Sequence, residues 1–486
     1  MYSENTRITN QIHGAFGELI TAHKTPVVQI SNKYDIDPAL LDKLEVFEAT
    51  GGAATNNGNL FQCSTGTSVG GYGVIRSKNT LNYKAGQGIE GQITAKFTTG
   101  IPLSLQFGGM FSITETVAFG YNGSNFGIIH EYGGAVEVQL ITVTVTGAGT
   151  CTVTLDGDAV GITTTASTVQ INAFELYTGL VANPTLNSKW RFEQIDDMVY
   201  CVAKSVGDKT GTMSISGGVT ATISEQTVGV AKTSNNVEQA DWNRQVTPFV
   251  GFDPTQLNIY KVRFGYLGVA NIEYSVYNPN TGEWVLVHSV EWASAQSITH
   301  LGSPDLKIGW TAASLGASGT NLVVEGASAS IMIEGDEVLE NDTHALTASK
   351  TGIGTTLTNV LTLKNRVIYG DRYNHSKVKP LRLSIDNDHT KGAIIEIYKN
   401  ATLGGTSNYQ FTGEFNSVVI KDTLSTTVVG TDLIDAFTIP AGGSTSVELS
   451  GISPDFLPND YLTVAVKTIS GTGAVISVAI TWREDK

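Results

Sequence analysis

Ile93-Thr-Ala-Lys-Phe-Thr98 alternates between apolar and polar residues at every step. Successive side chains of a β-strand point to opposite faces of the sheet, so Ile93, Ala95 and Phe97 would share one face. The stretch therefore predicts a half-buried strand. The same alternation recurs at residues 190–195, 198–202, 260–264, 272–277 and 284–288.

Turn residues join two of these stretches. The segment Tyr277-Asn-Pro-Asn-Thr-Gly-Glu-Trp284 carries Asn, Pro and Gly between two alternating runs, which predicts a β-hairpin. The composition agrees, because 53 glycines stand among many Val, Ile, Thr and Ser residues and only 15% of residues are charged. Two packed antiparallel sheets are the expected product.

Helix signals are almost confined to Asp37-Pro-Ala-Leu-Leu-Asp-Lys-Leu44. Asp37 can cap the free amide groups, and Pro38 suits the first helical position. The sequence therefore predicts one short helix in an otherwise all-β chain.

The 486 residues have the length of roughly two to four domains. Residues 1–45 have the pattern of an extended N-terminal arm, and the apolar-polar stretch Pro26-Val-Val-Gln-Ile30 is equally compatible with a strand of the first sandwich. Residues 46–333 are predicted to form that first β-sandwich. An inserted β module interrupts it at about 137–188, where Thr-rich stretches flank Asp156-Gly-Asp158. A second Thr/Ser/Gly-rich excursion from residue 211 is expected to pair with the module.

An acidic run without strand or helix periodicity, residues 334–345, is predicted to be a linker. Residues 346–486 follow with period-two apolar spacing at 380–385, 393–398, 461–466 and 475–482. They predict a second, jelly-roll-like β-sandwich whose last strand lies within a sheet. The fold class expected is thus all-β, with tandem antiparallel β-sandwiches, an N-terminal arm and an inserted β module.

Charge and cysteine usage exclude several classes of function. The net charge of −15 repels phosphate backbones, and no Lys/Arg stripe interleaved with aromatics offsets it, so no nucleic-acid partner is expected. No window has the ~18 apolar residues needed to span a bilayer. Cys63, Cys151 and Cys201 lie far apart without metal-ligand spacing, and we expect reduced core thiols.

Three acidic clusters are candidate catalytic or metal sites. Asp196-Asp197 lies in a predicted turn, as do Asp386-Asn-Asp-His389 and Asp156-Gly-Asp158. Turns use these residue types by default, the later acid of a calcium loop is missing, and no Gly-x-Ser-x-Gly has the strand-then-helix context of a nucleophile elbow. The sequence therefore predicts no catalytic, cofactor-binding or metal-binding residue, and a protein that is not an enzyme.

Aromatic residues near turns offer one binding alternative. Their rings can stack on the C–H face of a sugar, although strand-end aromatics more often close a sandwich core. Both interpretations stay open for Tyr121, Phe126, Tyr132, Trp292 and Tyr373.

A succession of short motifs carries a resemblance to a known class. It comprises Gly14-Ala-Phe-Gly-Glu-Leu19, residues 76–89, residues 93–98, Phe119-Gly-Tyr-Asn-Gly-Ser-Asn-Phe-Gly127 and Trp284-Val-Leu-Val-His288. Together these stretches resemble β-sandwich virion structural proteins of tailed bacteriophages and large aquatic DNA viruses. The resemblance covers about residues 14–333. The inserted module and the C-terminal domain have no counterpart in it.

The resemblance implies a non-enzymatic component of a viral particle, either a tail or baseplate protein or a head-attached fibre or decoration protein. It implies contacts of residues 1–45 with other virion proteins, self-association as a homo-oligomer, for which we expect a trimer, and location in the virion after assembly in the host cytoplasm. The alternative is a carbohydrate-binding adhesin that attaches to host surface glycan. A polysaccharide depolymerase is the least favoured reading.

Overall fold

A computed structural model describes residues 24–32, 36, 44–81, 86–209, 213–265, 269–302, 305–316, 319–335, 342–370, 372–413, 416–430, 432–451 and 455–485. This part of the chain is all-β, as predicted, with antiparallel pairing between its strands. The predicted helix at residues 37–44 lies outside the described residues except for Leu44, which begins a strand. None of the helices described has the length and apolar character that crossing a membrane requires.

The chain divides into two compact units. Unit 1 comprises Met1–Gly134 and Ala231–Val338, and unit 2 comprises Ala135–Val230 and Leu339–Lys486. We call residues 135–230 the inserted module and residues 339–486 the C-terminal domain. The module interrupts unit 1 in sequence but belongs to unit 2 in space.

Unit 1 contains a nine-stranded sheet with the order β21-β20-β19-β6-β23-β4-β3, to which β24 joins through β6 and β1 joins through β24. All of its pairings are antiparallel. The strands are β1 (Lys24–Ser31), β3 (Ala53–Asn57), β4 (Leu60–Ser64), β6 (Gly88–Phe97), β19 (Asn258–Gly265), β20 (Ile272–Asn278), β21 (Glu283–Val290), β23 (Val323–Gly326) and β24 (Ser328–Glu334).

The second sheet of unit 1 has eight strands in the order β17-β9-β8-β7-β22-β5-β2, with β18 also paired to β9. A short 3-10 helix, Gln239–Asp241, follows β18. The strands are β2 (Leu44–Ala49), β5 (Tyr72–Ser77), β7 (Ser104–Phe111), β8 (Thr116–Asn122), β9 (Asn125–Tyr132), β17 (Thr233–Ser234), β18 (Val237–Glu238) and β22 (Lys307–Ser314).

One apolar core holds the two sheets of unit 1 together. Ile93, Ala95 and Phe97 of β6 are all buried in it, as their alternation predicts, whereas Thr94 and Lys96 are half-buried on the other face. The predicted hairpin is also present, with Tyr277 paired to Trp284. The sandwich is therefore built by the period-two pattern that the sequence displays.

The strand β1 belongs to this sandwich. It pairs with β24 of the same chain, and Val28 and Ile30 are buried in the core of unit 1. Of the two structures considered for residues 26–30, the strand of the first sandwich is the one observed. Residues 1–23 lie outside the described part of the chain.

The inserted module contains a four-stranded sheet, β13-β14-β10-β16, and a three-stranded sheet, β12-β11-β15. Its limits are wider than the predicted 137–188, because strands after residue 188 complete both sheets. The second Thr-rich excursion pairs with the module, as predicted, through β15 and β16. The strands are β10 (Val136–Val145), β11 (Gly149–Leu155), β12 (Asp158–Thr164), β13 (Trp190–Ile195), β14 (Met198–Val206), β15 (Ser214–Ser216) and β16 (Thr220–Thr227).

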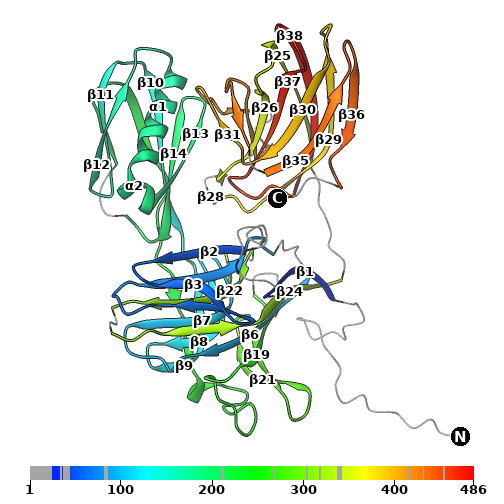
Figure 1. Cartoon of the computed structure of the whole chain (residues 1–486). Coiled ribbons are helices and arrows are strands. Elements are labelled where there is room, and N and C mark those ends of the chain that lie inside the picture. Colours follow the sequence, from blue (N-terminus) through cyan, green and yellow to red (C-terminus); the bar gives the residue numbers. More distant parts are fainter. Residues whose placement is uncertain are drawn as a thin grey trace, which may run out of the picture. The chain divides into compact units, whose positions relative to one another are not determined.

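Two helices, α1 (Val169–Ala182) and α2 (Pro184–Lys189), lie against the strands of the module (Figure 1). The expectation that helix is almost confined to residues 37–44 is therefore wrong. The Thr168 hydroxyl caps α1 by accepting a bond from the Ile171 amide, and Asn183 caps α2 in the same way. Helix α1 buries Asn172, Ala173, Leu176 and Leu180, which follow the spacing of one helical face.

The C-terminal domain is a second sandwich, of a four-stranded sheet β25-β38-β29-β36 and a six-stranded sheet β32-β33-β26-β37-β30-β35. Both sheets contribute to one core, and β38 is an interior strand, as predicted for the chain end. The strands are β25 (Asp342–Ile353), β26 (Thr358–Asn365), β29 (Lys377–Asn387), β30 (Ala393–Lys399), β32 (Gln410–Phe411), β33 (Val419–Asp422), β35 (Asp432–Ile439), β36 (Ser444–Glu448), β37 (Tyr461–Thr468) and β38 (Ala474–Asp485).

Two short ribbons complete this domain, and the predicted linker is shorter than expected. The ribbons are β27 (Ile368–Tyr369) with β28 (Arg372–Tyr373), and β31 (Thr402–Leu403) with β34 (Val428–Val429). Of the predicted linker at 334–345, Glu334 ends β24 and residues 342–345 belong to β25. Residues 336–341 lie outside the described residues.

Candidate functional site

A buried carboxylate joins the inserted module to the C-terminal domain within unit 2. Glu193 of β13 is fully buried, and its Oε1 lies 3.1 Å from the Nζ of Lys364, which is also buried. The backbone amide of Val367 donates to both Glu193 oxygens at 3.0 Å. An ionised carboxylate in a low-dielectric interior needs such a cation and such donors, and Glu193 has both.

Neighbouring residues extend this junction. The Gln194 side-chain nitrogen donates to Asn408 Oδ1 at 3.0 Å, and the Asp196 amide donates to the Tyr409 carbonyl at 2.6 Å. The Arg191 guanidinium donates to the Tyr373 hydroxyl and lies over its ring. The junction therefore uses residues along the whole of β13 and the turn that follows it.

A cleft lies beside this junction, where the start of α1 faces a loop and strand of the C-terminal domain. Its volume is about 500 Å³. We call it the neutral cleft, because none of the residues that line it is charged. They are Thr168, Gln170, Ile171, Thr406, Asn408, Gln410, Leu424 and Thr426.

Buried Asp422 supports one wall of the neutral cleft. Its Oδ1 accepts bonds from the backbone amides of Asn408 at 3.0 Å and Leu424 at 3.1 Å. Its Oδ2 accepts from the Ser425 hydroxyl and the Ser425 amide. Two lining residues are thus fixed to the same carboxylate.

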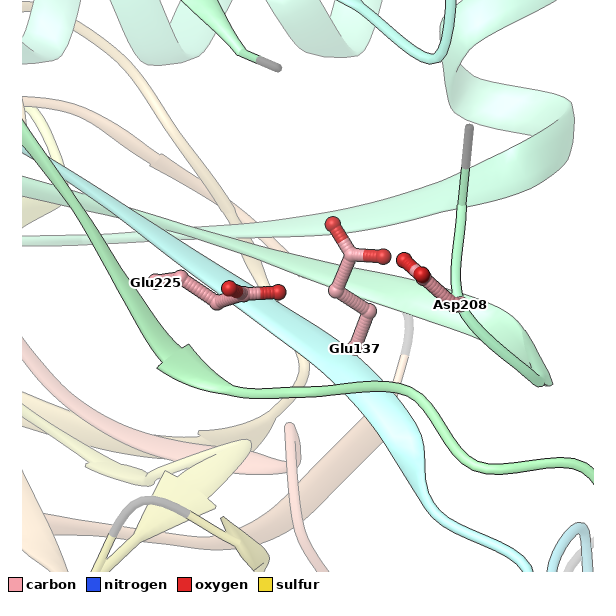
Figure 2. A group of neighbouring side chains, drawn as sticks. All are labelled: Glu137, Asp208 and Glu225. Atoms are coloured by element: carbon pink, nitrogen blue, oxygen red, sulfur yellow. The ribbon is translucent and has the colours of Figure 1, made fainter. Parts of the chain in front are cut away.

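A group of three acids was not singled out in the sequence. Glu137 on β10, Asp208 after β14 and Glu225 on β16 have carboxylate oxygens within 4.8 Å of one another, and Figure 2 shows them turned toward each other. Carboxylates of this kind suit a hard cation such as Ca²⁺ or Mg²⁺. The two oxygens of buried Glu137, however, already accept bonds from Gln139 Nε2 at 2.8 Å and the Lys209 amide at 2.6 Å. The structure thus explains Glu137 as an anchor for the segment after β14.

In unit 1, charged side chains gather on the outer face of the nine-stranded sheet. Glu90 Oε2 lies 2.6 Å from Lys24 Nζ and 4.0 Å from Lys261 Nζ, and Gln92 donates to Glu90 Oε1. Lys261 also lies over the Trp284 ring at 4.4 Å. We call this set, Lys24, Glu90, Gln92, Lys261 and Trp284, the charged face.

The acids on this sheet are ionised rather than poised to donate a proton. Burial opposes ionisation of Glu90, but Lys261, Lys24 and Gln92 outweigh it and lower its pKa. Burial likewise opposes ionisation of Glu325, and Lys96, Asn57 and Gln62 together lower its pKa. A glycosidase needs a general acid with a raised pKa, so neither carboxylate suits that role.

The acids considered in the sequence lie in turns. Asp156 adopts a φ of 49° and Gly157 of 78°, the left-handed pair that a tight hairpin needs. Lys189 forms ion pairs with both Asp156 and Asp158, so both carboxylates have a structural partner. Asp196 also has a positive φ, 54°, in the β13–β14 turn. These acids form turns and structural contacts.

The Asp386-Asn-Asp-His389 cluster ends β29. Asp386 and Asp388 are exposed, and His389 Nδ1 accepts a bond from the Lys391 amide. Asn387 is buried and donates to the carbonyls of Lys391 and Pro440. The segment therefore has the hydrogen bonds of a turn.

The aromatic residues considered for sugar stacking mostly close cores. Tyr121, Phe126 and Trp292 are buried in unit 1, and Tyr132 packs against them half-buried. Tyr373 contacts Arg191 at the junction. The packing interpretation is thus the observed one for the three buried rings, which cannot offer a face to a sugar.

Trp292 packs in unit 1 against two buried histidines. Its ring centroid lies 5.8 Å from that of His130 and 6.0 Å from that of His300. Burial lowers the pKa of both imidazoles to about 4, and each histidine's neighbours modify that value. At neutral pH both rings are uncharged parts of the core. Cys63, Cys151 and Cys201 are likewise buried, each as a free thiol.

No protein-family model matches the sequence, and no curated protein matches it. Among solved structures, the chain is similar to lectin II from Ulex europaeus, with 6% identity over 64% of this chain and 100% of that one at a TM-score of 0.25. Arcelin-5, a lectin-like defense protein from Phaseolus vulgaris, has 10% identity over 65% and 100%, with a TM-score of 0.24. Infectious bursal disease virus, Gx strain, has 8% identity over 84% and 79%, with a TM-score of 0.16. These scores are too low to argue a function.

Proposed function

We propose that the chain is a non-enzymatic structural component of a viral particle. It would be a phage tail or baseplate protein, or a head-attached fibre or decoration protein. Its location would be the virion, after assembly in the host cytoplasm. The virion assignment is supported by the resemblance of the short motifs between residues 14 and 288 to virion β-sandwich proteins.

One observation carries the non-enzymatic part of this proposal, namely the way in which the buried acids are used. Glu193 is held by Lys364 and backbone amides, and Glu90 and Glu325 are held by lysines that lower their pKa values. Such acids hold the fold together through ion pairs and hydrogen bonds with neighbouring groups. This is the pattern of a scaffold.

The arm and the sheet edges are the proposed contacts within the particle. Among the described strands, β1 pairs with β24 alone, so its other edge is open to an added strand. Residues 1–45 would bind other virion proteins, and copies of the chain would associate as a homo-oligomer, which we propose to be a trimer.

Cryo-electron microscopy of intact particles, together with mass spectrometry of their proteins, tests the proposal. We expect repeated density for the chain on a symmetry axis, with contacts through residues 1–45. Light scattering of the purified chain tests the trimer separately. Particles that lack the chain would refute the structural role, whatever the oligomeric state in solution.

A carbohydrate-binding adhesin for host attachment is the second candidate function. The observation that favours it is the neutral cleft, whose hydroxyl and amide side chains suit an uncharged polar ligand. Binding of purified protein to host cells, before and after removal of surface glycans, tests this function as a whole. Equal binding to both cell preparations would remove it.

A further inference from the structure

We propose that the neutral cleft is a binding site for an uncharged glycan. The inference rests on the adhesin function above and deepens it, because it assigns the ligand class and the residues. It places recognition at the junction of the inserted module with the C-terminal domain, in a cleft whose lining includes none of the aromatic residues named in the sequence analysis.

The chemistry of the lining selects the ligand. Of the eight residues that line the cleft, three carry a side-chain amide and three carry a hydroxyl group, and none is charged. Amides and hydroxyls offer both donors and acceptors, as do the hydroxyl groups of a sugar. A phosphate, carboxylate or ammonium ligand would be desolvated in this cleft without an opposite charge. The lining therefore favours a neutral, hydroxyl-rich ligand.

Apolar groups complete this lining. Ile171 is half-buried in the cleft wall, and Leu424 is 56% exposed. An exposed leucine beside amide side chains offers an apolar surface to the C–H groups of a sugar ring. Ligand sites of this type combine an apolar wall with a small number of placed polar groups.

Asn408 supplies the polar group that is best placed. It is 7% exposed, its Oδ1 accepts a bond from Gln194, and its backbone amide is bound to Asp422. Its side-chain amide also carries N–H donors, and these can donate to a sugar oxygen in the cleft.

The walls are fixed before any ligand binds. One wall begins at Thr168, whose hydroxyl caps α1, and the other is bound to Asp422. The buried Glu193–Lys364 pair and the Gln194–Asn408 bond hold the two walls together. A preformed site loses little conformational entropy on binding, which raises its affinity for a small ligand.

Each cleft should nevertheless bind weakly, because its lining includes no aromatic ring. Repetition of the chain on a particle would compensate. Linked sites can raise the overall binding strength by about 10² to 10⁴ over one site. The cleft therefore fits attachment by many copies better than capture by one.

The test uses the purified full chain and saturation-transfer NMR. The probes are neutral oligosaccharides of glucose, galactose and N-acetylglucosamine, with sialylated and uronate-containing counterparts as charged comparators. Gln170→Ala and Gln410→Ala are combined in one variant, because neither side chain makes another described hydrogen bond. Gln296→Ala, an exposed glutamine of unit 1, is the matched control.

We expect saturation transfer to at least one neutral oligosaccharide. Loss of two hydrogen bonds should weaken its binding at least about tenfold in the Gln170/Gln410 variant and leave it unchanged in the control. Thermal unfolding of the three proteins should coincide. Unchanged binding in the double variant would refute the neutral cleft as the binding site, but it would not refute the adhesin function. Binding of the charged oligosaccharides alone, or of no oligosaccharide at all, would also refute the neutral cleft as a site for an uncharged glycan. The particle experiment above is independent of all these outcomes.

Discussion

The junction in unit 2 and the charged face in unit 1 are both built on a glutamate that binds a lysine. At the junction Glu193 is 0% and Lys364 7% exposed, whereas on the charged face Glu90 is 4% and Lys24 25% exposed. Glu193 also accepts hydrogen bonds from backbone amides, and it has one lysine partner. Glu90 has two lysines within 4.0 Å.

The comparison shows that partner number and solvent access decide what such a pair does. A buried pair adds little net stability over an apolar pair, but loss of one member leaves an unpaired charge in the interior. When a pair at a sheet surface loses its lysine, water or a second lysine can take over the contact with the glutamate. The junction should therefore be intolerant of substitution, and the charged face tolerant.

The largest effect is expected from Glu193→Ala. It leaves Lys364 buried without its carboxylate and removes the acceptor of the Val367 amide, so we expect a loss of about 3–5 kcal/mol. Calorimetry of the full chain, with hydrogen exchange of β13 peptides, measures it. The double variant Glu193→Gln with Lys364→Met keeps an acceptor and removes both charges. It should be clearly milder, and an equal loss in both would contradict the unpaired-charge explanation.

Acid should lower the stability of unit 1, which contains two buried histidines. His130 and His300 have folded pKa values of about 4, below the ordinary 6.5, so the unfolded state binds protons first as the pH falls. Their stabilisation is present above pH 6.5 and is lost between pH 6.5 and 4, by roughly 3 kcal/mol for each histidine. Calorimetry across this range should show that the unfolding temperature of unit 1 decreases with pH. In a His300→Gln variant this temperature should decrease less steeply. An equal slope in both proteins would contradict the role given to His300.

A moderate effect is expected at the packing of α1 in the module. A Cβ on Gly179 would lie 2.6 Å from the Ile162 side chain on β12, so Gly179→Ala should cost about 1–3 kcal/mol in overpacking, despite the better helix propensity of alanine. Urea denaturation measures the loss. The same substitution together with Ile162→Ala should cost less than the sum of the two single changes. Strict additivity would show that the helix shifts instead.

The smallest effect is expected from Lys24→Ala on the charged face. Lys261 remains beside Glu90, so the loss should stay below about 1 kcal/mol and shrink as salt screens the pair. Urea denaturation at low and high salt measures it. A loss as large as that of Glu193→Ala would abolish the contrast between the two regions.

Most strands of this fold follow from local alternation. Trp190–Ile195 is a strand over the predicted residues, and the Tyr277–Trp284 pair closes the predicted hairpin. Helix α1 was missed because its β-branched and aromatic residues favour strands, and Gly179 weakens a helical pattern. Gly179 is explained only by the close approach of β12, which the sequence does not display.

The junction and the cleft could not be predicted for a different reason. Glu193 and Lys364 are 171 positions apart, and each occupies a strand that alone would place it at a surface. A single sequence shows which residues face one way, but not which sheet will cover them. The neutral cleft joins three separate segments, and its residues have no spacing that distinguishes them from ordinary turns.

The path of the chain has a mechanical consequence. The polypeptide passes between the units three times, after Gly134, Val230 and Val338, and Ala135 and Val230 exchange backbone hydrogen bonds where the module begins and ends. A protease that cut the backbone once, between residues 336 and 341, would not release the C-terminal domain. Two chain connections, after Gly134 and Val230, would still link unit 1 to the module. The module would still bind the C-terminal domain through the Glu193–Lys364 pair. A single cut at this place therefore leaves the C-terminal domain attached to the module by noncovalent contacts.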